Sequence, residues 1–139
     1  MANHPEPSML AASLSKKVAI YRAVLFMSIT LNLVSAIFGL LWPDSFTGTL
    51  NQPNVSPDTW PRLWGAQLIA LNFLYFPGYW DPVVHRWPNW CGIVIRLTFA
   101  VFFFTQGDGF TTMGLVDGAA GLVLLFTYLP VVRAAREVR

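Results

Sequence analysis

Three ionisable side chains lie inside long apolar stretches of the sequence, where charged groups are rare. They are Arg22, Arg96 and Asp117. Even on insertion scales, an arginine or aspartate at the centre of a membrane-spanning helix costs about 2.5 to 3.5 kcal/mol, so such residues are candidates for a functional role. Paired with each other or with other residues, they would hold helices together. Left accessible, they would bind a polar ligand or carry a proton, and the residue types alone leave both interpretations open.

The depth of each charged group decides which partners it reaches. At a rise of about 1.5 Å per residue, Arg96 lies roughly 13 Å and Asp117 roughly 6 Å from the 106–112 turn that joins their segments. A long guanidinium arm closes such a gap, which makes an Arg96–Asp117 pair one arrangement. The alternatives are Arg62 as the partner of Asp117 and Asp81 as the partner of Arg96. Arg22, about one turn inside the opposite boundary, reaches the headgroups or Asp81 by snorkelling.

Neutral polar side chains accompany these charges in the apolar segments. Ser28 and Asn32 share one helical face because residues four apart are neighbours. Gln67 and Asn72 lie in the next segment, and amides of this kind either bond across helices, for about 0.6 kcal/mol each, or line a small polar cavity. The candidate intramembrane polar site therefore comprises Arg22, Asn32, Gln67, Asn72, Arg96 and Asp117.

Several other kinds of chemistry are excluded by the residue inventory. His4 and His85 are the only histidines and neither lies in an apolar segment, so one chain supplies no bis-histidine haem or carboxylate–histidine metal site. Cys91 is the only cysteine, which rules out an internal disulfide and a thiolate cluster. A net charge of +2 without a basic stripe argues against a nucleic-acid partner. We predict no catalytic residue, no metal and no cofactor.

The elements that must position these residues are membrane helices. Of the 139 residues, 55% are hydrophobic and only 12% are charged, against roughly 25% charged in a soluble domain. Apolar residues gather into four blocks, at 18–41, 63–79, 89–105 and 113–132, each near the roughly 20 residues that a bilayer-spanning helix needs. We therefore predict an all-α integral membrane four-helix bundle over residues 16–139, preceded by a polar arm at residues 1–15.

Basic residues predict how this bundle lies in the membrane, because cytoplasmic loops collect Lys and Arg. The 43–61 loop and the 106–112 turn carry aspartates and no basic residue, so we place both outside. All six tryptophans fall at predicted boundaries, as expected for rings that prefer the headgroup level. We expect both termini on the cytoplasmic face of a bacterial inner membrane, a face that collects Lys16, Lys17, Arg86, Arg133, Arg136 and Arg139.

A weak internal match links the second and fourth segments at a shift of 53 residues. The matched residues are Gly65-Ala66, Phe73, Tyr75 and Pro77, which correspond to Gly118-Ala119, Phe126, Tyr128 and Pro130. The match indicates a pair of similar helical hairpins, related like the parallel repeats of some transporters. Apolar sequence also matches itself by chance, and that alternative stays open.

The 89–105 segment is rich in phenylalanine and has no stripe of small residues like that of the 113–132 segment. We expect this segment to face outward, because small residues are what allow helices to pack closely in lipid. Phe99, Phe102 and Phe103 then contact either lipid or the transmembrane helix of a partner, for which they form a candidate docking surface.

The overall pattern resembles the DoxX-like group of small four-helix bacterial membrane proteins. The features that carry the resemblance are the length, the topology, Tyr21-Arg22 in the first segment, Gly65 in the second and Arg96 in the third. The resemblance implies a four-helix fold in a bacterial membrane. The glutamate of that group's second helix is missing here, so no functional residue and no quinone-linked role is carried over.

Three classes of function follow. The first is a non-catalytic accessory subunit of a larger inner-membrane complex, because the chain is almost wholly apolar and offers no catalytic motif. The second is a small carrier or channel acting as an oligomer. The third is a subunit that contacts quinone or another lipophilic redox substrate through Arg96, Asp117, Gln67 and Asn72. The expected partners are the lipid bilayer and other membrane protein subunits.

Overall fold

The computed structural model describes residues 7–52 and 59–138, and these residues are helical with no strand. The all-helical prediction is therefore confirmed. Six elements follow one another along the chain: α1 (Pro7–Leu41), α2 (Pro43–Thr49), α3 (Thr59–Trp80), α4 (Arg86–Thr105), a short 3-10 turn η1 (Asp108–Phe110) and α5 (Thr111–Glu137).

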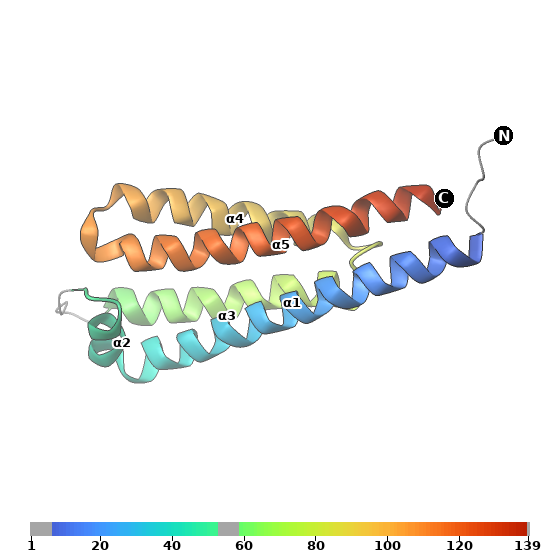
Figure 1. Ribbon diagram of the computed structural model, residues 1–139. Coiled ribbons are helices and arrows are strands. Elements are labelled where there is room, and N and C mark those ends of the chain that lie inside the picture. The colour runs from blue at the N-terminus through green and yellow to red at the C-terminus, as the bar shows by residue number, and fades with distance from the viewer. Residues whose placement is uncertain (1–6, 53–58, 139) are drawn as a thin grey trace.

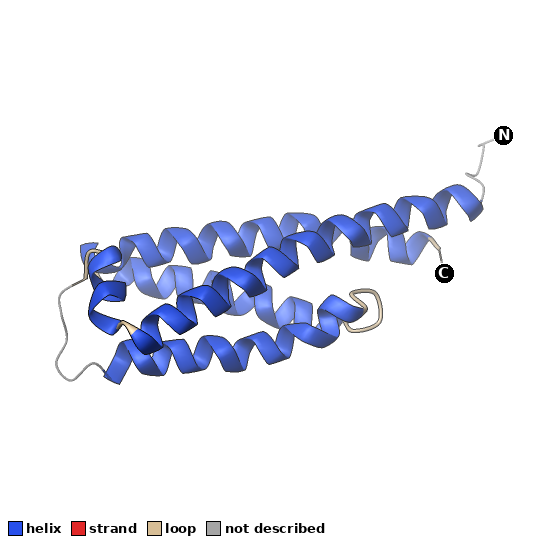
Figure 2. Ribbon diagram, turned by 90° about the horizontal axis from the view of Figure 1, so that it is seen from below, coloured by secondary structure: helices blue, strands red, loops and turns tan. Residues whose placement is uncertain are grey.

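The four long helices form a ring in which each packs along two neighbours. Helix α1 lies beside α3 and α5, and α4 lies beside α3 and α5 (Figure 1). Helix α1 begins and α5 ends at one end of the bundle, while α2 and the turn between α4 and α5 lie at the other (Figures 1 and 2). Successive long helices therefore run in opposite directions, and we call the second of these ends the α2 end.

Three of the long helices have the length and apolar character needed to cross a membrane: Ser8–Leu41, Arg86–Thr105 and Thr111–Glu137. Their outward faces carry large exposed apolar side chains such as Leu31, Val101 and Val116. An exposed apolar surface of this extent is typical of contact with lipid. Helix α3 is not one of the three, because arginine, amide and aromatic residues with polar atoms lower its hydropathy.

Several helix boundaries differ from the predicted ones. Helix α1 begins at Pro7, so residues 7–15 of the predicted arm are helical, and residues 1–6 lie outside the described part of the chain. Proline suits the first turn of a helix because its missing N–H has no intrahelical partner there. Helix α4 starts at Arg86 and α5 runs to Glu137, in each case beyond the apolar block itself. Helix α2 lies in what was predicted to be a loop.

The hydrophobic core is densest near the end that lacks α2. The rings of Tyr21 and Tyr128 lie 4.7 Å apart between centroids, and Leu25 and Leu124 are buried beside them. The Tyr128 hydroxyl donates to the Pro82 carbonyl oxygen at 3.0 Å, which ties α5 to the α3–α4 connection. The buried hydroxyl thus has the partner that its removal from water requires.

Residues paired by the internal match occupy similar places. Tyr75 in α3 and Tyr128 in α5 are both buried, whereas Phe73 and Phe126 are both exposed. The two matched segments also each carry a proline inside the helix, Pro77 in α3 and Pro130 in α5. Helices α1 and α3 pack together, as do α4 and α5, so the two halves are both helical hairpins.

Candidate functional site

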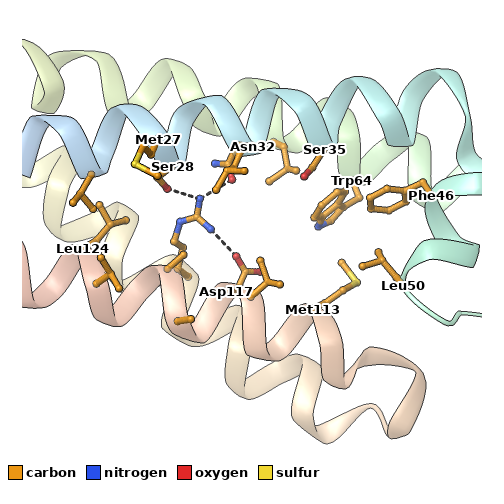
Figure 3. Close-up of a pocket in the computed structure, with 18 residues that line it drawn as sticks. Met27, Ser28, Asn32, Ser35, Phe46, Leu50, Trp64, Met113, Asp117 and Leu124 are labelled. Carbon is orange, nitrogen blue, oxygen red and sulfur yellow. Dashed lines mark hydrogen bonds and ion pairs between the residues drawn. The ribbon is translucent and has the colours of Figure 1, made fainter.

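One arginine at the centre of the bundle gathers polar side chains from two other helices. The Arg96 Nη1 donates to the Asp117 Oδ1 at 2.8 Å, forming an ion pair between α4 and α5. Its Nη2 donates to the Ser28 Oγ at 2.9 Å and to the Asn32 Oδ1 at 2.6 Å, both on α1 (Figure 3). Helices α1 and α4 lie diagonally across the ring, so this guanidinium spans the bundle interior.

Small residues around Arg96 allow this arrangement. Gly92 and Ala100 stand one turn before and after it on the buried face of α4. On α5, a Cβ at Gly121 would lie 3.3 Å from the Arg96 Cβ, so the absence of a side chain lets the two helices approach closely. Asp117 sits one turn before Gly121 on the same helix and is thereby brought to the guanidinium.

The network also reaches the fourth long helix. The Asn32 Nδ2 donates to the Asn72 Oδ1 of α3 at 3.3 Å, so hydrogen bonds link all four long helices through one cluster. Within the described residues, three buried polar atoms of this region have no hydrogen-bond partner: the Asn72 Nδ2, the Tyr75 hydroxyl and the Arg96 Nε. Buried polar groups are normally satisfied, so unpaired atoms are a feature that requires a functional or structural reason.

The other predicted partners are engaged elsewhere. The Arg62 Nη1 donates to the Leu40 carbonyl oxygen at 2.8 Å. The Asp81 Oδ1 accepts from the backbone N–H groups of Val83 and Val84, at 3.0 and 2.9 Å. Of the two arrangements considered for Asp117, the structure therefore contains the pair with Arg96.

Two of the six predicted polar residues lie away from this cluster. The Arg22 guanidinium stacks 5.0 Å from the centroid of the Tyr79 ring, a cation–π contact nearer the end of the bundle that lacks α2. Gln67 is exposed on the outer face of α3, so it neither bonds across the helices nor lines the interior. Sequence reasoning missed Tyr75, whose only signal was its match to Tyr128.

A pocket of about 540 Å³ lies against this cluster, between α1 and α5. Its polar lining comes from Ser28, Asn32, Ser35, Arg96 and Asp117, and the rest of the wall is almost wholly apolar. Toward the α2 end, the pocket is lined by Phe46 of α2, by Leu50 directly after α2, by Trp64 of α3 and by Met113 of α5 (Figure 3).

The pocket opens sideways through the outer surface of the bundle. Met27 and Leu31 of α1 and Val116 of α5 line it and are about 60% exposed, at 64%, 63% and 60% respectively. These side chains belong to the surface that carries the other exposed apolar residues.

The two charged groups at the pocket differ in accessibility. The Arg96 side chain is 5% exposed and the Asp117 side chain 14%. Because the pair is in direct contact, the two opposite charges compensate each other, and Asp117 is the more exposed side chain of the two. Among the described residues, no cluster of three or more His, Cys, Asp or Glu side chains is arranged to hold a metal ion.

The predicted docking surface needs a correction. Phe103 is buried, at 7% exposed, and its ring stacks on that of Phe110 with 6.0 Å between centroids. It shares the inward stripe of Arg96 and Ala100, which the spacing of three and four residues dictates. Phe99 and Phe102 are exposed, so only part of the predicted surface faces outward. Helix α4 thus has a packed face that includes the small residues Gly92 and Ala100, and an exposed face that includes Phe99 and Phe102.

No protein-family model, curated protein sequence or solved structure matches the chain. The resemblance to the DoxX-like group therefore stays a prediction, and the functional argument depends on the site itself.

Proposed function

We propose that this chain is a multi-pass membrane protein that binds a lipid-soluble small molecule in the pocket between α1 and α5. The observation that carries the proposal is an apolar pocket of about 540 Å³ that opens on the exposed apolar surface and has the Arg96–Asp117 pair in its wall. Ligand pockets are typically of this size, mostly apolar, with a few polar groups that orient the ligand. Charged residues at membrane depth that face a cavity commonly mark such sites.

The proposal includes a fourth crossing by α3. This helix has 22 residues, and at about 1.5 Å per residue it is long enough for a hydrocarbon core of about 30 Å. Its polar residue Asn72 is buried and bonded to α1, which removes it from lipid. Four crossings with both termini in the cytoplasm of a bacterium agree with the basic residues at the two ends of the chain.

Binding of this kind agrees best with the third class predicted from the sequence, a protein that contacts a lipophilic molecule. A quinone or another lipid-soluble redox molecule is one member of that class. The accessory-subunit and carrier hypotheses concern the assembly in which the site operates. Extraction in a mild detergent and mass measurement of the intact particle separate these two hypotheses. A particle that contains other subunits supports the accessory-subunit hypothesis, and a homo-oligomer that moves a solute into liposomes supports the carrier hypothesis.

The binding proposal is tested by photolabelling the purified protein in lipid nanodiscs with an alkyl diazirine that has no polar group. We expect saturable labelling of pocket residues on α1 and α5, which excess unlabelled alkane reduces. Val116→Trp should place a large ring at the pocket opening and lower this labelling. Leu115→Trp is the matched control, because Leu115 is the adjacent residue, is 61% exposed against 60% for Val116, and does not line the pocket.

Two results would count against binding. One is labelling of the pocket that rises linearly with the probe concentration, as it does for ordinary lipid-facing positions. The other is equal loss of labelling in the Val116→Trp and Leu115→Trp variants, which would show that the effect comes from the added ring and not from the pocket.

A further inference from the structure

The hydrogen-bonding state of the ion pair restricts which ligand heads fit the pocket. Both N–H groups of the Arg96 Nη2 are used, one by Ser28 and one by Asn32, and Nη1 donates to Asp117. The remaining guanidinium N–H groups belong to a side chain that is 5% exposed, and the Nε–H among them is buried without a partner. Asp117 uses Oδ1 for this pair, and its other carboxylate oxygen is not one of the buried atoms without a partner. The group that the pair offers to a ligand is a carboxylate oxygen, which accepts hydrogen bonds.

The charges of the pair select against charged heads. An anionic head would meet the Asp117 carboxylate first, while the arginine that would attract it is only 5% exposed. A cationic head would be attracted by Asp117 but would stand close to the Arg96 guanidinium. Charges interact strongly in an apolar interior, and an ion leaving water also loses its hydration. A site that is already neutral is best matched by an uncharged head.

The rest of the pocket wall requires an apolar ligand body. On the α2 side of Asp117, the rings of Phe46 and Trp64 pack with 5.0 Å between centroids, and Met113 faces them (Figure 3). On the other side lie Met27 and Leu124. Apart from the Trp64 indole N–H and the Ser35 hydroxyl, this part of the wall offers no strong hydrogen-bonding group, so most polar groups placed away from Asp117 would lose their water contacts without compensation.

From these three observations we infer that the pocket selects a neutral, lipid-soluble alcohol or phenol whose hydroxyl donates a hydrogen bond to the Asp117 carboxylate. This inference rests on the proposed binding function and specifies its ligand class. Hydrogen bonds to a charged acceptor are roughly twice as strong as neutral ones, which makes the head group the main source of selectivity. A molecule that only accepts hydrogen bonds, such as an ether or a ketone, would leave the carboxylate oxygen without a donor.

The test uses the wild-type protein and the same alkyl diazirine, with competitors of one chain length that differ only in the head. The competitors are a long-chain primary alkanol, its methyl ether, the corresponding methyl ketone, the alkylammonium ion and the fatty carboxylate, each compared at equal concentration in the bilayer. We expect the alkanol to displace the probe at a concentration about tenfold or more below that of the ether and the ketone. The two charged competitors should be weaker than the alkanol.

The possible results separate the inference from the function on which it rests. Equal displacement by all heads would overturn the selection of a donor, while the pocket would remain a binding site. Stronger displacement by the ketone or the carboxylate would show that Arg96 is the group that meets the ligand, and would also overturn the inference. Absence of saturable labelling by the diazirine itself would instead overturn the binding function.

A pair of variants then assigns the preference to one residue. Asp117→Asn replaces the carboxylate by a neutral amide and should reduce the alkanol preference over the ether to about threefold or less, because the charge-assisted part of the bond is lost. Asp44→Asn makes the same change at an exposed carboxylate that does not line the pocket, and it should leave the preference unchanged. An unchanged preference in Asp117→Asn would contradict the inference. If that variant does not fold, the competitor series in the wild-type protein decides the question alone.

Discussion

Each single substitution that breaks the Arg96–Asp117 pair should cost about as much stability as removing both partners together. Asp117→Asn keeps an oxygen acceptor but leaves the Arg96 charge, in a side chain that is 5% exposed, without a counter-charge. Removing one partner of a buried pair typically costs about 3 to 5 kcal/mol. Arg96→Gln leaves the carboxylate alone and removes the donor used by Ser28 and Asn32, so we expect a loss of about the same size.

The double variant removes both charges, so its loss should be close to that of one single variant. If each single variant loses about 3 kcal/mol and the double variant also loses about 3 kcal/mol, the coupling energy between the two residues is about 3 kcal/mol. This is at the upper end of the values measured for contacting residues. The free energy of unfolding is measured by titrating SDS into mixed micelles and following circular dichroism. Arg133→Gln, on an exposed part of α5, is the control and should change the value by less than about 0.5 kcal/mol. Losses that simply add, within about 0.5 kcal/mol, would refute the pair as one energetic unit.

Three further predictions use the same purified protein or intact cells. Gly92→Ala should lower the free energy of unfolding by about 1 to 3 kcal/mol, because the new Cβ would collide with the Tyr75 ring. Gly48→Ala is the control, since a Cβ there meets no atom, and it should leave that free energy unchanged or raise it by up to about 1 kcal/mol. Equal effects of the two variants would show that the contact between Gly92 and Tyr75 leaves room for a methyl group. Gln67→Leu should leave the free energy of unfolding unchanged or raised because the amide is exposed, while Asn72→Leu should lower it by about 1 to 3 kcal/mol by removing the acceptor of Asn32. A larger loss for Gln67→Leu would place that amide in an interface. In a Cys91→Ala background, Thr49→Cys should react with an impermeant thiol reagent in intact cells, whereas Glu137→Cys should react only after permeabilisation. The reverse result would invert the proposed topology.

Composition and block length were enough to predict the helices, because lipid imposes a simple length requirement on apolar segments. The same reasoning misplaced their ends. Helix α1 continues to Pro7 and α5 to Glu137, since a helix whose middle is fixed by packing extends through polar residues of good helix propensity. Helix α2 was missed because seven residues that include a glycine give too short a pattern to distinguish from a turn.

For the site, the sequence identified the charged residues but left their partners open. Depth alone allowed Asp117 to pair with Arg62 or Arg96, and only the packing of α4 against α5 at Gly121 decides between them. Gln67 and Asn72 were equivalent candidates, yet they lie on opposite faces of α3 because they are five residues apart. The pocket itself was not predictable, because it depends on where α1 and α5 diverge.

The position of Arg96 explains how a ring of weakly amphipathic helices is held in one arrangement. Helices in lipid have no hydrophobic force to bring them together, so close packing and hydrogen bonds must specify the bundle. The guanidinium acts across the diagonal, where backbones are too far apart to touch, and fixes α1 and α5 relative to α4. The pocket lies directly beside this side chain, with Arg96 and Asp117 in its wall. A ligand that bonds to Asp117 would therefore act directly on the contact that joins α4 to α5.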